Sequence, residues 1–355
     1  MATVFFFVCT VYNLLISILE KSKTKKMRQL VVATHNLMNG RRLGGLLQVY
    51  RQALPKLKVK ILCLQENIDL EHFRCDSDHC GRRKWHGGPD AGGVIAAALG
   101  RSWRRSELRA KDPRLVTLFD EHNFDLITQD IVTLPRLGAL NWLERTYISA
   151  GEPEQKHALF SLFRSTRRVS GGSYYRSKKK KFVPERRRIK HRARVRIIVA
   201  NTHLDAAGTN QHRTNQMNAV ASSLSTWARK HIRPQHRRLA VFLVAADTNC
   251  FEISRQSQRN ALHRIMLPLN LAIGALDLHD YSNPDTHWFA RTDEPGLGHK
   301  VVSFLGRLGI DAPRRYDVLA SNVPALAMGT IAAVDSDHDV VWASLRTSRS
   351  DWRFT

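Results

Sequence analysis

Continuous apolar runs alternate with helical patterns along residues 28–345, and this alternation limits the possible folds more than any other feature. Runs of five to ten residues predict buried strands at 30–35, 59–64, 125–134, 158–163, 195–204, 239–246, 316–320, 330–334 and 340–345. The spacing of apolar residues predicts helices at 42–54, 211–231 and 255–269, and the composition of 71–93 is typical of a loop. Apolar strands separated by helices indicate an α/β body whose sheets are covered by helices.

Polar side chains stand where several of these strands end, which is where a rigid sheet holds functional groups. Four carboxylates and two amides among them are hard oxygen donors that suit Mg²⁺ or Mn²⁺, and the absence of thiolates argues against structural zinc. A divalent metal with carboxylates and histidines is equipped to hydrolyse a phosphodiester or a phosphomonoester. The set comprises Asn36, Glu66, His203, Asp247, Asn249, Asp317, Asp337 and His338.

The chain carries 56 Lys and Arg against 31 Asp and Glu, a formal net charge of +25. This excess favours polyanionic partners, which are nucleic acid, an anionic membrane or phosphorylated small molecules. Part of it lies in a basic run at 176–196. That run fits a contact with nucleic acid or phospholipid, or a nuclear-import signal. It fits equally well a solvated insertion, because like charges repel and do not pack.

Residues 1–19 contain no charged side chain, and Lys21–Arg28 follow with five basic residues. Nineteen uncharged residues are just long enough to cross a bilayer. In that interpretation the basic stretch places the rest of the chain on the cytosolic side. The other interpretation is a terminal extension with no membrane role, and the sequence leaves both open.

Five cysteines at irregular spacing indicate no disulfide framework, which favours a reducing, intracellular compartment. Four metal-binding side chains lie close together in the predicted loop, but their spacing fits no common zinc-finger pattern, so no zinc site is expected there. They are His72, Cys75, His79 and Cys80.

Six short motifs occur in a defined order, ATHN, LCLQEN, NTHLD, ADTN, RYDV and SDHD. In this order they resemble the endonuclease/exonuclease/phosphatase superfamily, which has the deoxyribonuclease I-like fold. The resemblance extends from about residue 28 to residue 345. It implies a four-layer α/β sandwich, in which two packed mixed β-sheets are flanked by helices.

The resemblance also implies the metal site. Asn36 and Glu66 are similar to the family's metal-site residues, with Glu66 as the principal ligand. Asp337 is similar to a further metal-linked carboxylate. The implied cofactor is Mg²⁺ or Mn²⁺.

The remaining motif residues resemble the family's catalytic groups. His338 is similar to the active-site histidine, which Asp317 orients through a hydrogen bond. Asp247 resembles the carboxylate that positions or deprotonates the attacking water. Asn249 resembles a donor to the scissile phosphate, and His203 a second histidine that contacts phosphate or assists the leaving group.

Three segments are expected: an apolar and basic N-terminal stretch at 1–27, a single domain at 28–347 with a basic insertion at about 166–194, and a tail at 348–355. The expected function is a divalent-metal-dependent phosphoric-ester hydrolase, a phosphodiesterase or nuclease acting on nucleic acid. One alternative is a phospholipid or inositol-phosphate hydrolase held at a membrane by residues 1–19. The other is a nucleic-acid-binding protein that kept the fold without the reaction. Gln155 and Lys156 are candidates to reach a phosphate, although a lysine is more often exposed.

Overall fold

The computed structural model describes the parts of the chain that form two sheets and the helices around them. These are residues 29–37, 43–67, 73–75, 83–85, 90–108, 111–139, 155–166, 169–170, 192–193, 195–237, 240–252, 254–277, 304, 315–333 and 336–346.

The first sheet has six strands in the order β15-β16-β1-β2-β6-β5. Its central pair, β1 and β2, is parallel, and the other pairs are antiparallel. The strands are β1 (Gln29–Asn36), β2 (Val59–Gln65), β5 (Trp103–Leu108), β6 (Asp112–Asp120), β15 (Ala325–Ile331) and β16 (Val340–Arg346). Two helices, α2 (Leu43–Leu57) and α3 (Ala91–Leu99), cover its outer face.

The second sheet also has six strands, in the order β13-β14-β12-β11-β8-β7. Here β11 and β12 are the parallel pair. The strands are β7 (Phe124–Thr133), β8 (His157–Ser165), β11 (Arg196–His203), β12 (Ala240–Asp247), β13 (Leu276–Asp277) and β14 (Asp317–Ser321). Its outer face is covered by α5 (Asn210–His231) and α7 (Arg255–Ile273), and the short α6 (Pro234–Arg237) follows α5.

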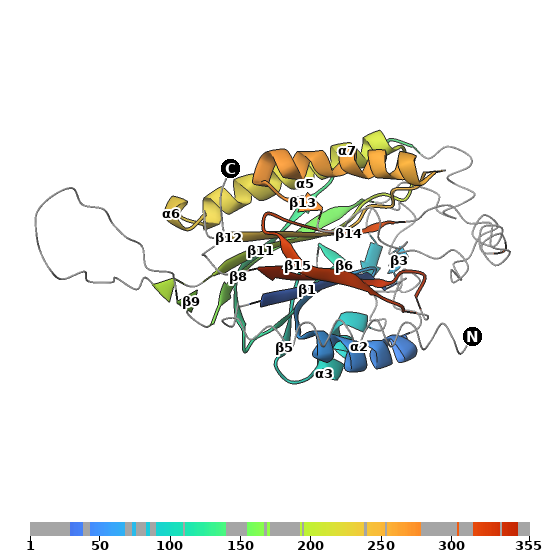
Figure 1. Ribbon diagram of the computed structural model, residues 1–355. Coiled ribbons are helices and arrows are strands. Elements are labelled where there is room, and N and C mark those ends of the chain that lie inside the picture. The colour runs from blue at the N-terminus through green and yellow to red at the C-terminus, as the bar shows by residue number, and fades with distance from the viewer. Residues whose placement is uncertain are drawn as a thin grey trace, which may run out of the picture.

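Three separate apolar cores hold these layers together. One fills the space between the two sheets, and the other two lie between each sheet and its helices. Figure 1 shows the resulting order of layers, with α5 and α7 on one outer side and α2 and α3 on the other. Central strands are buried on both faces, which explains why they are apolar throughout. The predicted four-layer α/β sandwich is confirmed.

The structure adds elements that the apolar pattern did not predict. These are α3, β5, β6 and two short hairpins, β3 (Phe73–Cys75) with β4 (Arg83–Trp85) and β9 (Val169–Ser170) with β10 (Arg192–Ala193). The predicted strand at 330–334 is wrong in position, because β15 ends at Ile331. The sequence of β5, WRRSEL, is polar because the strand lies at the edge of its sheet.

Several predictions fall outside the described residues. They are the segment 1–27 with its membrane alternative, most of the basic insertion at 166–194, the tail at 348–355 and the His/Cys cluster apart from the Cys75 backbone. Within the described part of the chain, none of the helices combines the length and apolarity that crossing a membrane requires. Cys63 and Cys250 are free thiols, and both are buried.

Candidate active site

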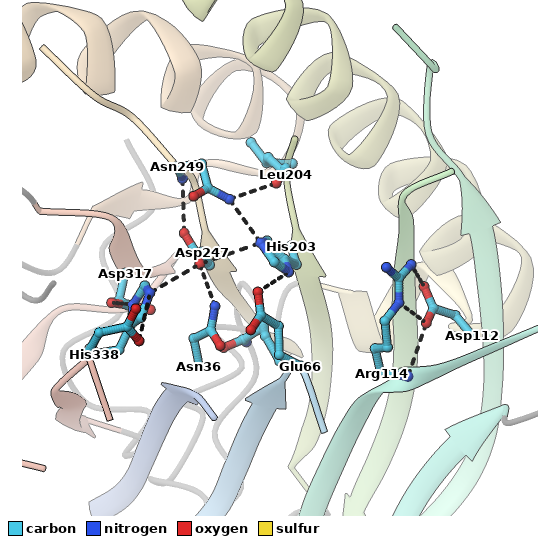
Figure 2. A network of polar contacts seen from close by, with 12 residues as sticks. Asn36, Glu66, Asp112, Arg114, His203, Leu204, Asp247, Asn249, Asp317 and His338 are labelled. Carbon is cyan, nitrogen blue, oxygen red and sulfur yellow. Dashed lines mark hydrogen bonds and ion pairs between the residues drawn. The ribbon is translucent and has the colours of Figure 1, made fainter. Parts of the chain in front are cut away.

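The predicted site residues come together at one edge of the two sheets, where β1, β2, β11 and β12 end (Figure 2). The antiparallel strands β14 and β16 begin at the same edge. We call it the catalytic edge. The contacts described below join all eight predicted residues, which the two sheets contribute jointly.

Asp247, the last residue of β12, is the centre of this arrangement, and its side chain is buried. Asn36 of the other sheet donates from Nδ2 to Asp247 Oδ2 at 2.8 Å, and the Asn249 backbone N–H donates to Oδ1 at 2.9 Å. The Nε2 atoms of His203 and His338 lie 3.6 and 3.8 Å from Oδ2. Burial alone would raise the pKa of Asp247, but the two imidazoles and the two hydrogen bonds outweigh it and lower that pKa. Asp247 is therefore held as a carboxylate between two histidines.

His338 forms a dyad with Asp317. Its Nδ1 donates to Asp317 Oδ2 at 2.7 Å, and both side chains are buried. Burial alone would lower the pKa of His338, but the negative charges of Asp317 and Asp247 outweigh it and raise that pKa well above its usual value. This shift favours the protonated form of the ring, and Nε2 faces Asp247 at 3.8 Å.

A second buried histidine supports the backbone at His338. Nε2 of His35 donates to the carbonyl oxygen of His338 at 3.0 Å. The hydroxyl group of Tyr50, on α2, then donates to Nδ1 of His35. Burial lowers the pKa of His35 to about 4, so its ring is neutral and both of its nitrogens have partners. Neither His35 nor Tyr50 was predicted as a site residue.

His203 lies between the two sheets, with Nδ1 at 3.7 Å from Glu66 Oε1. Asn249 Nδ2 donates to His203 Nε2 and to the carbonyl oxygen of Leu204, each at 2.9 Å. In the neutral form of His203, Nε2 accepts this bond and the ring hydrogen sits on Nδ1 toward Glu66. Because both amide hydrogens of Asn249 are engaged, donation to a phosphate requires Asn249 to exchange one of these bonds.

Glu66 and Asn249 both have left-handed backbone, with φ of 51° and 47°. This conformation is costly for a glutamate. Asn67 holds the turn that imposes it: the Asn67 N–H donates to the Arg114 carbonyl at 3.0 Å, and Nδ2 donates to the Pro113 carbonyl at 3.1 Å. Asn67 Oδ1 accepts from the backbone N–H of Gly92 on α3. The local strain at Glu66 is thus balanced by a buried, fully bonded neighbour.

The two sheets are also joined just behind the site. Gln65, next to Glu66, donates from Nε2 to Asn201 Oδ1 at 2.6 Å. Asn201 lies two residues before His203 on β11 and donates from Nδ2 to the carbonyl oxygens of Leu64 and Val116, each at 3.0 Å. These bonds set the distance between the two halves of the site. Gln65 and Asn201 were not predicted, although each is a polar residue in an otherwise apolar strand.

The donor set fits a hard divalent cation. Asp337 Oδ1 lies 4.0 Å from His338 Nε2. Burial, followed by the negative charge of Asp337, raises the pKa of Glu66 to about 6. Two such carboxylates beside the Asn36 amide are ligands that Mg²⁺ or Mn²⁺ takes, and a cation would relieve their repulsion. Asp247, Asp317 and His338 also offer ligand atoms within 4.8 Å of one another.

Basic side chains flank the carboxylates on one side. Lys156 is only 7% exposed, against the expectation for a lysine, and its positive charge opposes the rise in the pKa of Glu66. Arg114 and His157 contact Asp112, at 3.0 and 2.9 Å (Arg114 and Asp112 are drawn in Figure 2). Gln155 donates from Nε2 to the carbonyl oxygens of Leu134 and Lys156, so its amide hydrogens are engaged by backbone.

No protein-family model and no curated protein sequence matches the chain. Its structure is similar to that of the endonuclease/exonuclease/phosphatase from Bacteroides vulgatus, with a TM-score of 0.52 and 12% identity over 90% of this chain and 98% of that chain. The human Nocturnin catalytic domain has a TM-score of 0.47 at 12% identity, over 89% of this chain and 94% of its own. D. rerio TDP2 has a TM-score of 0.49 at 11% identity, over 89% and 98%. The chain has the fold of the endonuclease/exonuclease/phosphatase proteins, as its motifs predicted.

Proposed function

We propose that this protein is a divalent-metal-dependent phosphoric-ester hydrolase that cleaves phosphodiester bonds in nucleic acid. One observation carries the proposal: a buried carboxylate, Asp247, lies between two histidines and beside the carboxylates Glu66 and Asp337. Water activation, charge stabilisation and phosphate binding each need one of these groups. These groups come from both sheets, so a chance arrangement of unrelated polar residues is a poor explanation.

Asp247 is the group that we assign to the attacking water. Its lowered pKa keeps it ionised at neutral pH, and a carboxylate held by Asn36 and Asn249 has a fixed direction. It therefore orients the water and accepts its proton. His338 is the group that we assign to the phosphate, because a cation held by Asp317 stabilises negative charge that develops on a phosphate oxygen.

His203 and Lys156 complete the proposed contacts with the ester. The Nδ1–H group of His203 faces Glu66 and would be available to the leaving oxygen when Glu66 holds a metal ion. Lys156 supplies a positive charge on the same side as Glu66. Glu66, Asp337 and Asn36 would hold the metal ion. When bound, that ion would screen the charge of the phosphate and help stabilise the leaving oxygen.

The net charge of +25 favours nucleic acid as the substrate. The alternatives from the sequence, a membrane phospholipid or inositol-phosphate hydrolase and a non-catalytic binding protein, make different predictions for the same experiment. The purified chain is incubated with plasmid DNA, abasic DNA, RNA, sphingomyelin and inositol phosphates, with Mg²⁺, with Mn²⁺ and with EDTA. We expect cleavage of a nucleic acid that EDTA abolishes.

Two site variants and two matched controls test the assignment. Glu66→Gln and His338→Ala are expected to reduce the rate by about 10²–10⁴-fold, as removal of an acid, base or charge-stabilising group does. Glu121→Gln and His263→Ala change the same residue types at positions away from the catalytic edge, and they should leave kcat unchanged. Cleavage that survives both site variants would contradict the assignment. Lipid cleavage without nucleic-acid cleavage would favour the first alternative, and binding without any cleavage the second.

A further inference from the structure

The topology separates the molecule into two edges. The parallel pairs β1–β2 and β11–β12 all end at the catalytic edge, so all four begin at the opposite edge. The antiparallel neighbours are consistent with this direction of the strands. At the opposite edge, Gln29 at the start of β1 pairs with Arg346, and Arg196 at the start of β11 pairs with Arg164. The turns from α2 into β2 and from α5 through α6 into β12 lie there too. We call this second edge the basic edge.

Positive charge gathers at the basic edge. Within two residues of the strand and helix ends there, the side chains that the structure describes include thirteen Lys or Arg and three carboxylates. Each carboxylate has a basic partner on the same edge: Lys60–Asp120 at 2.8 Å, Arg104–Glu121 at 2.6 Å and Arg164–Asp125 at 3.0 Å. Ten positive charges therefore remain in excess.

The catalytic edge has the opposite balance. By the same rule it carries eight carboxylates and five Lys or Arg side chains among the described residues. The described part of the chain is therefore polarised, with its excess positive charge remote from the residues that we assign to chemistry. The net charge of +25 does not simply report a basic active site.

The turn between α5 and α6 is an exposed part of the basic edge. Arg229, Lys230 and Arg233 are all exposed. Arg237 orders the turn by donating from Nε to the carbonyl oxygen of Ile232 at 2.9 Å and from Nη2 to that of Arg229 at 2.8 Å. The turn therefore presents several cations to solvent in a fixed arrangement, and its sequence from 229 to 238 contains no acidic residue.

We propose that the basic edge binds the phosphate backbone of a nucleic acid at a distance from the site of cleavage. The first and last of the eight residues of β11 are seven steps apart, so at about 3.3 Å per step the two edges are separated by about 23 Å. A lipid headgroup held at the basic edge could not reach the catalytic edge over that distance. A polynucleotide is a continuous chain of phosphates and can contact both edges at once. The partner that fits both the positive charge and the distance between the two edges is thus a polymer of phosphates. That this polymer is also the substrate depends on the proposed function.

Binding and cleavage should then be separable by substrate length. The test compares the full chain with Lys230→Glu/Arg233→Glu, using an oligonucleotide of about 40 nucleotides and one of about four. For the long substrate we expect the variant to raise KM by about tenfold. The slope of the logarithm of the binding constant against the logarithm of salt concentration should also become less steep, by the amount expected for the loss of about one to two phosphate contacts. For the short substrate kcat/KM should not change. The Lys230→Gln/Arg233→Gln variant should give a smaller effect in the same direction.

Arg51→Glu/Arg264→Glu is the matched control, since it makes the same change in charge at exposed positions in the middle of α2 and α7. An equal loss in this control, or an equal loss for long and short substrates, would overturn the proposal. So would binding to anionic vesicles that depends on Lys230 and Arg233 without any binding to the oligonucleotide. Binding is also measured in EDTA. Length-dependent binding in EDTA, together with no cleavage in Mg²⁺ or Mn²⁺, would refute the proposed hydrolase and leave this inference standing.

Discussion

Asn201 on one sheet donates from Nδ2 to the backbone carbonyl of Leu64 on the other, at 3.0 Å, inside an otherwise apolar interface. The same side chain accepts from Gln65, the residue before Glu66. The sheets that supply the two halves of the site are therefore connected by directional bonds as well as by apolar packing. Apolar packing alone tolerates small shifts, whereas these bonds fix one register between the sheets.

Asn201→Leu tests this connection. The substitution removes the side-chain donor to the Leu64 and Val116 carbonyls and one of the two acceptors of the Gln65 amide, so we expect a loss of about 2–4 kcal/mol in the free energy of unfolding. Urea denaturation measures it. Asn260→Leu, at an exposed position of α7, is the control and should change the value by less than about 0.5 kcal/mol. A similar loss in both variants would show that the bonds between the sheets have no special weight.

Asp317→Asn tests the His338 dyad. We expect kcat to fall by about 10²–10⁴-fold, because the cation facing the phosphate loses the carboxylate that holds it. Asp317 raises the pKa of His338, so its removal lowers that pKa. If protonated His338 is the active form, the alkaline decline of kcat moves to lower pH in the variant. A pH–rate profile measures this, with the partly exposed Asp125→Asn as the control. A profile that keeps its alkaline limb would refute this role of His338.

Asp112 should contribute to stability in a pH-dependent way. Burial alone would raise its pKa, but Arg114 and His157 outweigh burial and hold that pKa well below its usual range. Its contribution is therefore present above the unfolded pKa of about 4 and is lost as the pH falls below it. Asp112→Asn should weaken this decline and cost about 3–5 kcal/mol at neutral pH, because Arg114 is left without its carboxylate. Denaturation at several pH values measures both effects. An unchanged acid slope would contradict the prediction.

Two glycine variants test the strained turn at Glu66. A Cβ on Gly92 would lie 2.8 Å from Asn67 Oδ1, so Gly92→Ala should displace Asn67, release the turn and lower both stability and activity. Gly44, on α2, has nothing within 4 Å of the same position, so Gly44→Ala should stabilise the helix by about 0.5–1 kcal/mol. Thermal unfolding and a rate measurement on both variants provide the comparison. Equal behaviour of the two would show that Asn67 does not hold Glu66.

The sequence was most informative where chemistry and periodicity coincide. Glu66, Asp247 and His338 each follow or precede an apolar run, so their positions at strand ends could be predicted before the structure. That the strands belong to two different sheets came from the resemblance, because strand periodicity carries no information on which strands pair. β5 and α3 were missed since one is polar at a sheet edge and the other is apolar on nearly every face.

Residues that support the site were less accessible to prediction. His35, Asn67 and Asn201 act through bonds to backbone atoms of segments that are distant in sequence. Nothing in their local sequence identifies those partners. Lys156 was expected at the surface, because the average behaviour of a lysine says nothing about a nearby cluster of carboxylates. The distribution of charge between the two edges likewise depends on topology, and composition gives only its sum.

The central strand β1 lies between β2 and β16, and the Ser336 hydroxyl group donates to the Asn36 carbonyl at 3.1 Å across 300 positions of sequence. A chain that is translated only as far as residue 335 lacks Ser336, His338 and β16. The residues of the candidate site therefore cannot come together until translation has passed β16. The hydrolase that we propose would stay inactive up to that point of its synthesis.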